Sequence, residues 1–482
     1  MTVRRRWAIL AVLCLAQLVV VLDNTVLTVA VPALSTSLGA DTVDLQWIIN
    51  AYALVQCGLL LTAGATADRY GRKRLLLTGL VLFGLGSLAA GLAQSTGQLI
   101  AARAGLGVGG ALLVTGTLAV ALQISPADER PRAIGIWAAV SALGYATGPL
   151  LGGVILAHHA WGAIFLVNLP VVAVTLVAVA VLVPESRNPA GGPPDLVGAL
   201  LATVGMTALV YAVITATLLA LPAGLIVLVA FVAWEARTPY PMLDLRLFRS
   251  RRFSSAVAGV VLITFGSGGA LFLMTQHLQF VLGYTPLQAG LRMAPFALSI
   301  VALNVTGVSA IILRRVGASA AIAAGMVLLA AGLAVVAHLA ADGYGALLAG
   351  LLLMGAGCAL ANPAIIDAVM GAIPGESAGA GAGIDATMSE VGTSLGIAAL
   401  GAVLDARFAA LLPAVAGSFP AAMALADTDA ERVETVAAFR SGLEAGELAG
   451  AAAVLAGGLL TAYLLRTRRR SPEPSRADAR SA

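Results

Sequence analysis

The chain has 482 residues, of which 60% are hydrophobic and 11% are charged, against ~45–50% and ~25% in an ordinary globular domain. A soluble enzyme must cover its surface with polar groups, so this composition excludes one. At ~20 apolar residues per crossing, the length allows a polytopic membrane protein with little room for a soluble domain. The cysteines at 14, 57 and 358 lie inside apolar runs, which predicts packing residues and no disulfide or metal framework.

Apolar windows predict fourteen membrane-spanning helices. In chain order they cover residues 7–33, 46–67, 75–93, 98–124, 133–157, 162–183, 196–216, 218–235, 254–276, 287–312, 316–338, 344–370, 381–404 and 447–465. The least certain division is near Pro222, where a single apolar run has to hold two short helices. Counts of twelve or thirteen therefore stay open.

The positions of arginine and lysine predict the orientation, because these residues are retained on the cytoplasmic side during insertion. Of the 28, 23 fall in alternate connections or in the two terminal segments on the same side. We therefore expect a multi-pass protein of the cytoplasmic membrane with both termini in the cytoplasm. The net charge of +4 then reflects topology, and we expect no nucleic-acid partner.

An offset of 248 positions aligns residues 107–153 with 355–401 without a gap and with 12 identities in 47. Parallel repeats of this kind predict two six-helix bundles with substrate bound between them. We divide the chain into an N-terminal bundle (1–184), two inserted helices with a cytoplasmic loop (185–252), a C-terminal bundle (253–470) and a disordered tail (471–482). The polar connection 405–446 reads as a solvated, partly helical loop.

The connection after the second span reads GATADRYGRKRLLL, residues 64–77. Gly64 would allow close helix contact, Asp68 could pair with an arginine or cap a helix, and Gly71 suits a tight turn before the basic residues. The motif also contains Arg69 and Arg72. This spacing resembles the signature loop of the major facilitator superfamily.

Further matches follow in the order that this superfamily uses. The fourth span has LIAARAGLGVGGAL, the first has LDNTVLTVAVPAL, and the fifth has GYATGPLLGG, which contains Gly144, Gly148, Pro149 and Gly152. Together they resemble the fourteen-helix drug:proton antiporter family, over nearly the whole chain. The resemblance implies an all-α major-facilitator fold of two six-helix bundles plus two inserted helices. Thr28 and the reduced loop at 314–317 depart from the family pattern.

Few charges lie inside the apolar segments, and each costs ~2.5–3.5 kcal/mol at a helix centre unless it faces a partner or a cavity. Asp23 in the first span and Arg103 in the fourth lie at similar depth, and we expect them to form a direct or water-bridged pair in a proton relay. A static structural pair is the alternative. Glu390, in the thirteenth span, is expected to bind a proton or a cationic substrate, as acidic residues do there in the resembled family.

Two further features could serve the transport path. Gly148 and Pro149 would interrupt the fifth helix, because proline removes a backbone donor, and the kink could seal the cavity; ordinary small-residue packing is the alternative. Gln276, His277 and Gln279 could line the outer vestibule, with the histidine at the membrane interface.

We therefore predict a secondary transporter, not an enzyme, that exports hydrophobic drugs or antibiotics, including cationic ones, in exchange for protons by alternating access. An uptake permease or symporter for a small metabolite is the nearest alternative. A polytopic membrane enzyme or receptor is remote, because no catalytic cluster or ligand-binding domain is evident. We expect no cofactor, metal site or catalytic residue, and a monomer in the lipid bilayer with protons and a small hydrophobic molecule as partners.

Overall fold

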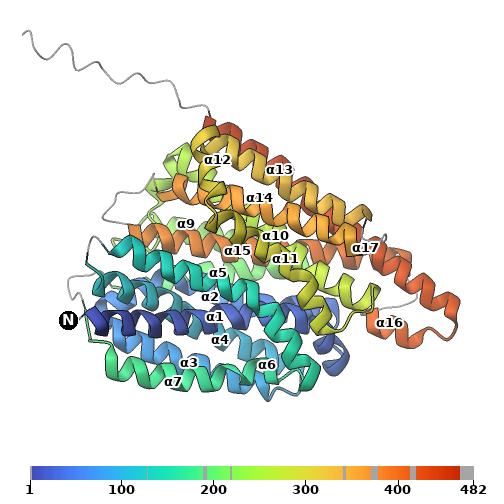
Figure 1. The fold of residues 1–482 in the computed structure, drawn as a ribbon, viewed down its shortest axis with the longest axis horizontal. Helices are drawn as coiled ribbons and strands as arrows, with labels where there is room; N and C mark the ends of the chain where they lie inside the picture. Colours follow the sequence, from blue (N-terminus) through green and yellow to red (C-terminus); the bar gives the residue numbers. More distant parts are fainter. Residues whose placement is uncertain are drawn as a thin grey trace, which may run out of the picture.

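The computed structural model describes residues 3–126, 129–187, 193–215, 217, 220–339, 344–370, 378–412 and 419–466. This part of the chain is mostly helical and contains no strand. Figure 1 shows long helices packed side by side along the length of the molecule. The first half holds α1 Val3–Leu38, α2 Thr42–Tyr70, α3 Arg72–Gly91, α4 Thr96–Ile124, α5 Arg130–His158, α6 Ala163–Leu166 and α7 Asn168–Leu182.

The remaining helices complete the bundle. They are α8 Leu196–Ile214, α9 Ala220–Glu235, the 3₁₀ helix η1 Leu245–Arg249, α10 Arg251–Gln276, the π-helical turn η2 His277–Val281, α11 Pro286–Val305, α12 Val308–Val316, α13 Ala318–Leu339, α14 Tyr344–Met370, α15 Ala378–Leu411, α16 Phe419–Leu425 and α17 Asp429–Arg466.

Twelve helical segments of the described chain are long and apolar enough to cross a membrane. They are α1, α2, α3, α4, the segment Ala163–Leu182, α8, α10 with η2, α11, α13, α14, α15 and α17. Two further apolar stretches, Thr147–His158 in α5 and Ala220–Glu235, are shorter. The chain is thus a multi-pass membrane protein, while the count of fourteen spans stays a prediction.

The buried apolar side chains form two large clusters that follow the two halves of the sequence. The first is built mainly on α1–α7, with Phe83 and Phe165 fully buried in it. The second is built mainly on α10–α14, with Phe253, Leu329 and Met354 at its centre. The first cluster also takes in Phe272, Phe408 and Phe439 of the second half, and the second takes in Val29 of α1, so the two cores are joined where the halves meet.

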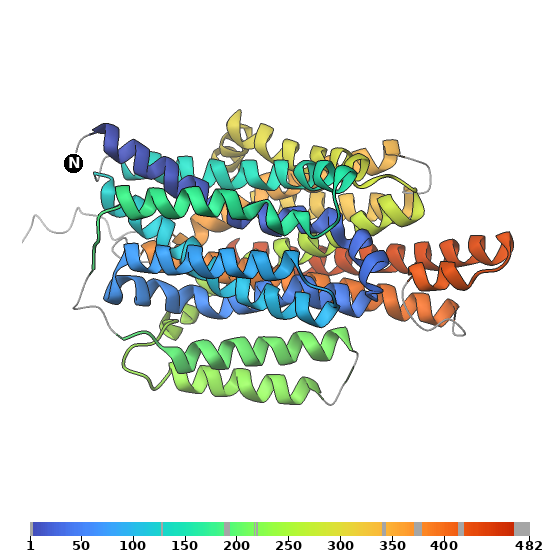
Figure 2. The same cartoon turned by 90° about the horizontal axis from the view of Figure 1, so that it is seen from below.

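Helices α8 and α9 lie as a separate pair along one side of the molecule, seen in green at the bottom of Figure 2. The Trp234 indole of α9 donates to both carboxylate oxygens of Asp195, which caps α8, at 3.0 Å each. The Thr62 hydroxyl of α2 donates to the Asp195 carbonyl at 3.3 Å. The pair is thus held to the N-terminal half through α2.

Two boundaries differ from those expected. The predicted span 287–312 ends at Val305, because Gly307 adopts φ +75° and restarts the chain as the short helix α12. Apolar composition continues across this break, so the sequence pattern did not show it. The connection 405–446 is more helical than expected: α15 continues to Leu411, and α17 begins at Asp429 rather than near 447.

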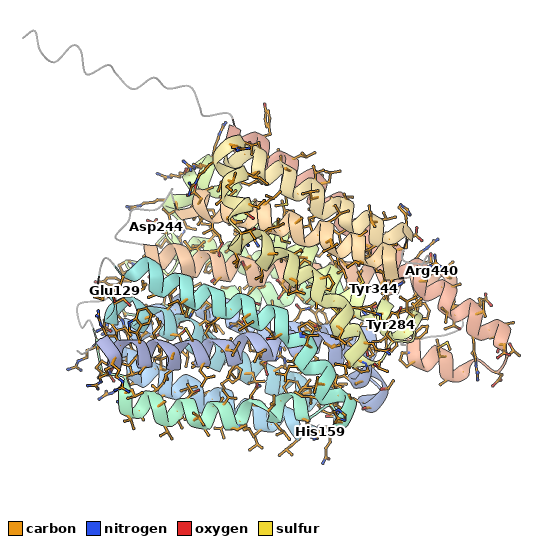
Figure 3. All side chains as sticks on the ribbon, in the orientation of Figure 1. Glu129, His159, Asp244, Tyr284, Tyr344 and Arg440 are labelled. Carbon is orange, nitrogen blue, oxygen red and sulfur yellow. The ribbon has the colours of Figure 1, made fainter. Side chains whose placement is uncertain are left out.

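The bundle has two ends, which Figure 3 marks through its labelled side chains. Glu129 and Asp244 lie at the end that holds the N-terminus, called here the N-terminal end. His159, Tyr284 and Arg440 lie at the opposite, far end. Helix α5, which begins just after Glu129 and ends at His158, therefore runs the whole distance between them.

Candidate transport site

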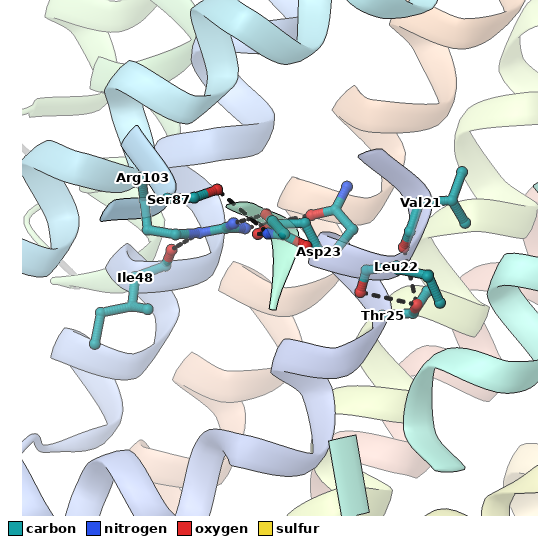
Figure 4. A network of polar contacts seen from close by, with 9 residues as sticks. Val21, Leu22, Asp23, Thr25, Ile48, Ser87 and Arg103 are labelled. Carbon is teal, nitrogen blue, oxygen red and sulfur yellow. Dashed lines mark hydrogen bonds and ion pairs between the residues drawn. The ribbon is translucent and has the colours of Figure 1, made fainter. Parts of the chain in front are cut away.

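The centre of the N-terminal half contains a buried ion pair. Asp23 of α1 is 2% exposed and Arg103 of α4 is 0% exposed. The Arg103 Nη1 atom lies 2.5 Å from the Asp23 Oδ2 atom. The structure thus brings together the two charges that the sequence singled out, as a direct pair (Figure 4).

Arg103 has further partners on the neighbouring helices. Its Nε atom donates to the Ile48 carbonyl of α2 at 3.1 Å, and its Nη2 atom donates to Asn24 Oδ1 at 3.3 Å. The guanidinium also lies over the Tyr52 ring, 4.4 Å from the centroid. A planar guanidinium with several donors suits such a site, since it can satisfy different acceptors at once.

The second Asp23 oxygen is also occupied. Asn168, the first residue of α7, donates to Asp23 Oδ1 at 2.8 Å and to Ser87 Oγ of α3 at 3.3 Å. The network therefore joins α1, α2, α3, α4 and α7. Removing one partner of a buried charge pair lowers the free energy of unfolding far more than removing one partner of an exposed pair. The intact pair therefore holds these five helices in one arrangement.

The glycine-rich stretch of α4 is what lets Arg103 reach α2. A β-carbon at Gly107 would lie 2.6 Å from the Tyr52 carbonyl, and one at Gly110 would lie 2.5 Å from the Tyr52 hydroxyl. Only glycine permits this separation of the two helices. The sequence GLGVGG after Arg103 is therefore part of the site's construction.

Glu390 lies on α15, in the C-terminal half, and is half-buried. It makes no hydrogen bond with the described residues, and Arg103 is the charged group that acts on it electrostatically. Its own charge acts in turn on the Cys57 thiol of α2. The structure thus places Glu390 within electrostatic reach of the Asp23–Arg103 pair but not in contact with it.

The glycines of α5 pack that helix against α1. A β-carbon at Gly144 would meet Val21 at 2.8 Å, one at Gly152 would meet the Val26 carbonyl at 2.9 Å, and one at Gly148 would collide with the Thr25 hydroxyl. Gly148 and Pro149 do not end the helix, since α5 continues from Arg130 to His158 with Pro149 inside it, and the expected kink stays a prediction. The four-residue spacing of the three glycines puts them on one face of α5, against which α1 packs closely.

The same part of α5 meets the C-terminal half. A β-carbon at Gly153 would lie 2.5 Å from the Leu287 Cα atom, and the Pro149 carbonyl lies directly against Gly290 of α11. At the same end, Gln279 donates to the Val29 carbonyl of α1 at 2.9 Å. These contacts join the two halves near the far end of the bundle.

The 64–77 connection is anchored at the N-terminal end. Gly71 has φ +116°, and a β-carbon there would lie 2.7 Å from a Glu185 carboxylate oxygen. Glu185 Oε1 accepts from the Lys73 backbone N–H at 3.2 Å, and Glu185 Oε2 lies 3.7 Å from Arg74 Nε. The Arg72 backbone donates to the Ser186 carbonyl at 2.9 Å. The loop therefore fixes α2 and α3 to the segment that follows α7.

Other residues of this motif have different surroundings. The expectation that Gly64 permits close helix contact is wrong, since a β-carbon there would meet nothing within 4 Å. The Asp68 side chain lies outside the described residues. Arg69 is exposed, with its guanidinium 5.9 Å from the Tyr70 ring. The Arg72 guanidinium donates to Gln123 Oε1 at 3.0 Å, which adds the end of α4 to the anchor.

Gln276 ends α10, and His277 and Gln279 lie in η2. These three polar residues do not lie on an exposed surface. Gln276 and His277 are 1% and 4% exposed, and Gln279 is half-buried. His277 is therefore buried in the protein, while its position at the membrane interface stays a prediction. The π-helical turn His277–Val281 directs His277 and Gln279 towards the protein interior. It is closed by a 3.0 Å hydrogen bond from the Leu282 N–H to the His277 carbonyl. Of these residues, Gln279 bridges the two halves through its hydrogen bond to the Val29 carbonyl.

Sequence reasoning missed several polar residues of this region. Asn168 holds Asp23, and Gln46, Asn50 and Gln56 of α2 are buried with atoms that have no hydrogen-bond partner in the described structure. The Gln46 amide lies directly against Gly401 of α15. A signal existed, since three amide side chains within one apolar helix are unusual in lipid. Amides carry no charge, so the search for charged groups passed over them.

Comparison with known proteins agrees with this architecture. The family model of the Major Facilitator Superfamily matches residues 13–397. The chain belongs to the major facilitator superfamily. Proteins of this superfamily are carriers and not enzymes, so the chain is a membrane transporter.

Several relatives match over most of their length. The chain is 37% identical to the multidrug resistance protein Stp of Mycobacterium tuberculosis, over 83% of this chain and 76% of that protein. It is 37% identical to the methyl viologen resistance protein SmvA of Salmonella typhimurium, over 86% and 85%. It is 35% identical to the multidrug efflux pump LfrA of Mycolicibacterium smegmatis, over 87% and 85%.

Solved structures support the fold. A bacterial homologue of the human lysosomal transporter Spinster, in an inward-facing, unoccupied conformation, superposes with a TM-score of 0.71 at 18% identity, over 98% of this chain and 100% of that one. The peptide transporter POT gives a TM-score of 0.65 at 16% identity, over 94% and 95%. At these identities the likeness concerns the major-facilitator fold alone.

Proposed function

We propose that this transporter exports hydrophobic drugs, including cationic ones, in exchange for protons across the cytoplasmic membrane. The observation that carries the proposal is the buried Asp23–Arg103 pair, with Glu390 on the opposite half and within reach of the same arginine. Relatives at 35–37% identity are named for multidrug or methyl viologen resistance and for multidrug efflux. Both facts support export over uptake of a metabolite.

The proton step follows from Arg103 having two acids within its electrostatic range. While Asp23 is ionised, the guanidinium is held by it at 2.5 Å and by the Ile48 carbonyl. When Asp23 takes up a proton, that pair loses most of its attraction, and the arginine charge acts more strongly on Glu390. Proton binding in the N-terminal half is thereby communicated to the C-terminal half.

Alternating access requires a closure at one end that can open. In this structure the far-end closure consists of Pro149 against Gly290, Gly153 against Leu287, and the Gln279 hydrogen bond to Val29. We propose that the far end faces the outside, with both termini cytoplasmic and with α5 and α9 completing fourteen spans. The α5–α11 contact is then the one that parts when the carrier opens outward.

A drug would bind between the halves, near Glu390. Gln56 of α2 lies next to Cys57, on which the Glu390 charge acts, and Gln56, Thr387 and Ser394 each carry a buried oxygen without a hydrogen-bond partner in the described structure. Weakly polar groups around one carboxylate accept cations of many shapes. Glu390 thus supplies the charge, and the amides and hydroxyls supply adaptable hydrogen bonds.

The test uses inside-out vesicles with an imposed proton gradient and a panel of lipophilic cations and neutral drugs. We expect Asp23→Asn to abolish gradient-driven accumulation of every substrate, and Glu390→Gln to impair cations more than neutral drugs. Glu434→Gln, an exposed carboxylate of α17, is the matched control and should transport normally. Cation accumulation at the wild-type rate by Glu390→Gln would refute its role, and accumulation driven only by the opposite gradient would indicate a symporter.

A further inference from the structure

Another buried acid lies far from Asp23 along the sequence, in the C-terminal half. Glu447 of α17 is 2% exposed, and neither of its carboxylate oxygens has a hydrogen-bond partner in the described structure. It precedes Arg466 by 19 residues, or roughly 28 Å of helix at ~1.5 Å per residue. In a hydrocarbon layer of ~30 Å, that places Glu447 close to the far boundary of the membrane.

Glu447 lines a small pocket at the far end, between α10, α13 and α17. The pocket has about 10 Å³ of free space, close to what one water molecule needs. Its lining includes His277 from the π-helical turn and, at four- and three-residue spacing on α17, Arg440 and Glu444. Residues so spaced lie on one helix face, so these α17 side chains follow one another from the surface towards Glu447.

The mouth of the pocket is exposed and can exchange protons with water. The His338 Nδ1 atom of α13 lies 3.1 Å from Glu444 Oε1, with the two side chains 58% and 41% exposed. Figure 3 shows Arg440 at this far end. On α15, which also packs against α17 and carries Asp405 in the same turn, Arg407 donates through its Nε atom to Ser441 of α17 at 3.2 Å. None of these cations is paired with Glu447 in the described structure.

An ionised carboxylate without hydrogen bonds is the costliest group to bury, while the uncharged acid is tolerated far better. We propose that Glu447 is a second proton-binding site, loaded from the outside through the His338–Glu444 mouth. It is separate from the Asp23 site, because it belongs to the C-terminal half and lies at the far end of the bundle. Two protons exchanged for one singly charged cation would let the membrane potential contribute to export as well as the pH gradient.

The proposal is tested on the purified full-length protein without any drug, by infrared spectroscopy across a pH titration. An uncharged carboxyl group has a carbonyl band that disappears on ionisation. We expect the wild type to show such a band, reversibly lost at alkaline pH, and Glu447→Gln to lose one titrating group per chain. Glu434→Gln, at an exposed glutamate of the same helix outside the pocket, is the matched control and should keep the band.

Glu447→Asp distinguishes loss of the carboxyl group from a folding defect. It retains a carboxyl group at this position, so the carbonyl band should shift and not disappear. An unchanged band in Glu447→Gln would overturn the proposal. A Glu447-dependent band that persists at alkaline pH would also overturn it, since the acid would then be a static hydrogen donor. Proton binding is measured here without transport, so failure of this proposal is distinguishable from failure of drug export.

Discussion

Replacing Asp23 with asparagine tests how strongly the buried pair holds the N-terminal half together. The substitution leaves Arg103 charged and 0% exposed, with the Ile48 carbonyl and Asn24 as its remaining acceptors. Removing one partner of a buried pair costs ~3–5 kcal/mol. Since the new amide can still accept one hydrogen bond, we expect the lower end of this range, about 3 kcal/mol.

The effect is measurable as a change in melting temperature. With an unfolding entropy of ~2.1 cal/mol/K per residue, a chain of this length has roughly 1 kcal/mol/K, so the melting temperature should fall by about 3 °C. The assay is thermal unfolding of the purified protein in detergent, followed by intrinsic fluorescence. Adding Arg103→Gln to Asp23→Asn removes the orphaned charge, so the double variant should lose less stability than the sum of the two single variants.

The matched control is Asp427→Asn, at an exposed aspartate between α16 and α17, which should leave the melting temperature within 1 °C or so of the wild type. The reasoning is refuted if Asp23→Asn behaves like this control, or if the effects of the Asp23 and Arg103 substitutions simply add. Either result would mean that the 2.5 Å contact carries little of the free energy of unfolding.

Three other predictions follow from the packing. Gly148→Ala should destabilise the protein by ~1–3 kcal/mol in the same thermal assay, because the new methyl group overpacks against α1. Its control is Gly105→Ala, where a β-carbon would meet no atom within 4 Å. That helical substitution should be neutral or stabilising by up to ~1 kcal/mol. Gly71→Ala forces a side chain into φ +116° and should cost at least ~1–2 kcal/mol; a drug-export rate equal to that of the wild type would contradict a conformational role for this turn. Trp234→Phe removes both hydrogen bonds to Asp195, so hydrogen exchange should rise in residues 196–235, and unchanged exchange there would show that other contacts hold the pair.

The membrane class, most helices and the central charge pair could be predicted from the sequence. Each depends on a feature that is visible locally: a long apolar segment, or a charged residue within one. Long apolar segments are unambiguous, and few charges lie within them, so Asp23, Arg103 and Glu390 stood out. Asn168 did not, because an uncharged amide at a helix start is common and its importance depends on which helix it meets.

Features that depend on tertiary neighbours could not be read in this way. Gly64 and Gly148 are both glycines in motifs, yet a β-carbon would have free space at the first and a collision at the second. The end of α11 at Val305 depends on the backbone angle of Gly307 and not on composition. Glu447 was passed over because the residues before it read as a polar loop, whereas α17 continues through them as one helix.

The most direct test of the central claim is proton movement itself. Acid-loaded inside-out vesicles containing the wild-type protein should release protons when a transported lipophilic cation is added, and vesicles with Asp23→Asn should not. The pH of the vesicle interior, followed with an entrapped dye, gives the measurement. Drug accumulation without any proton release from the wild type would contradict the account, because transport would then not depend on the proton that Asp23 is proposed to carry.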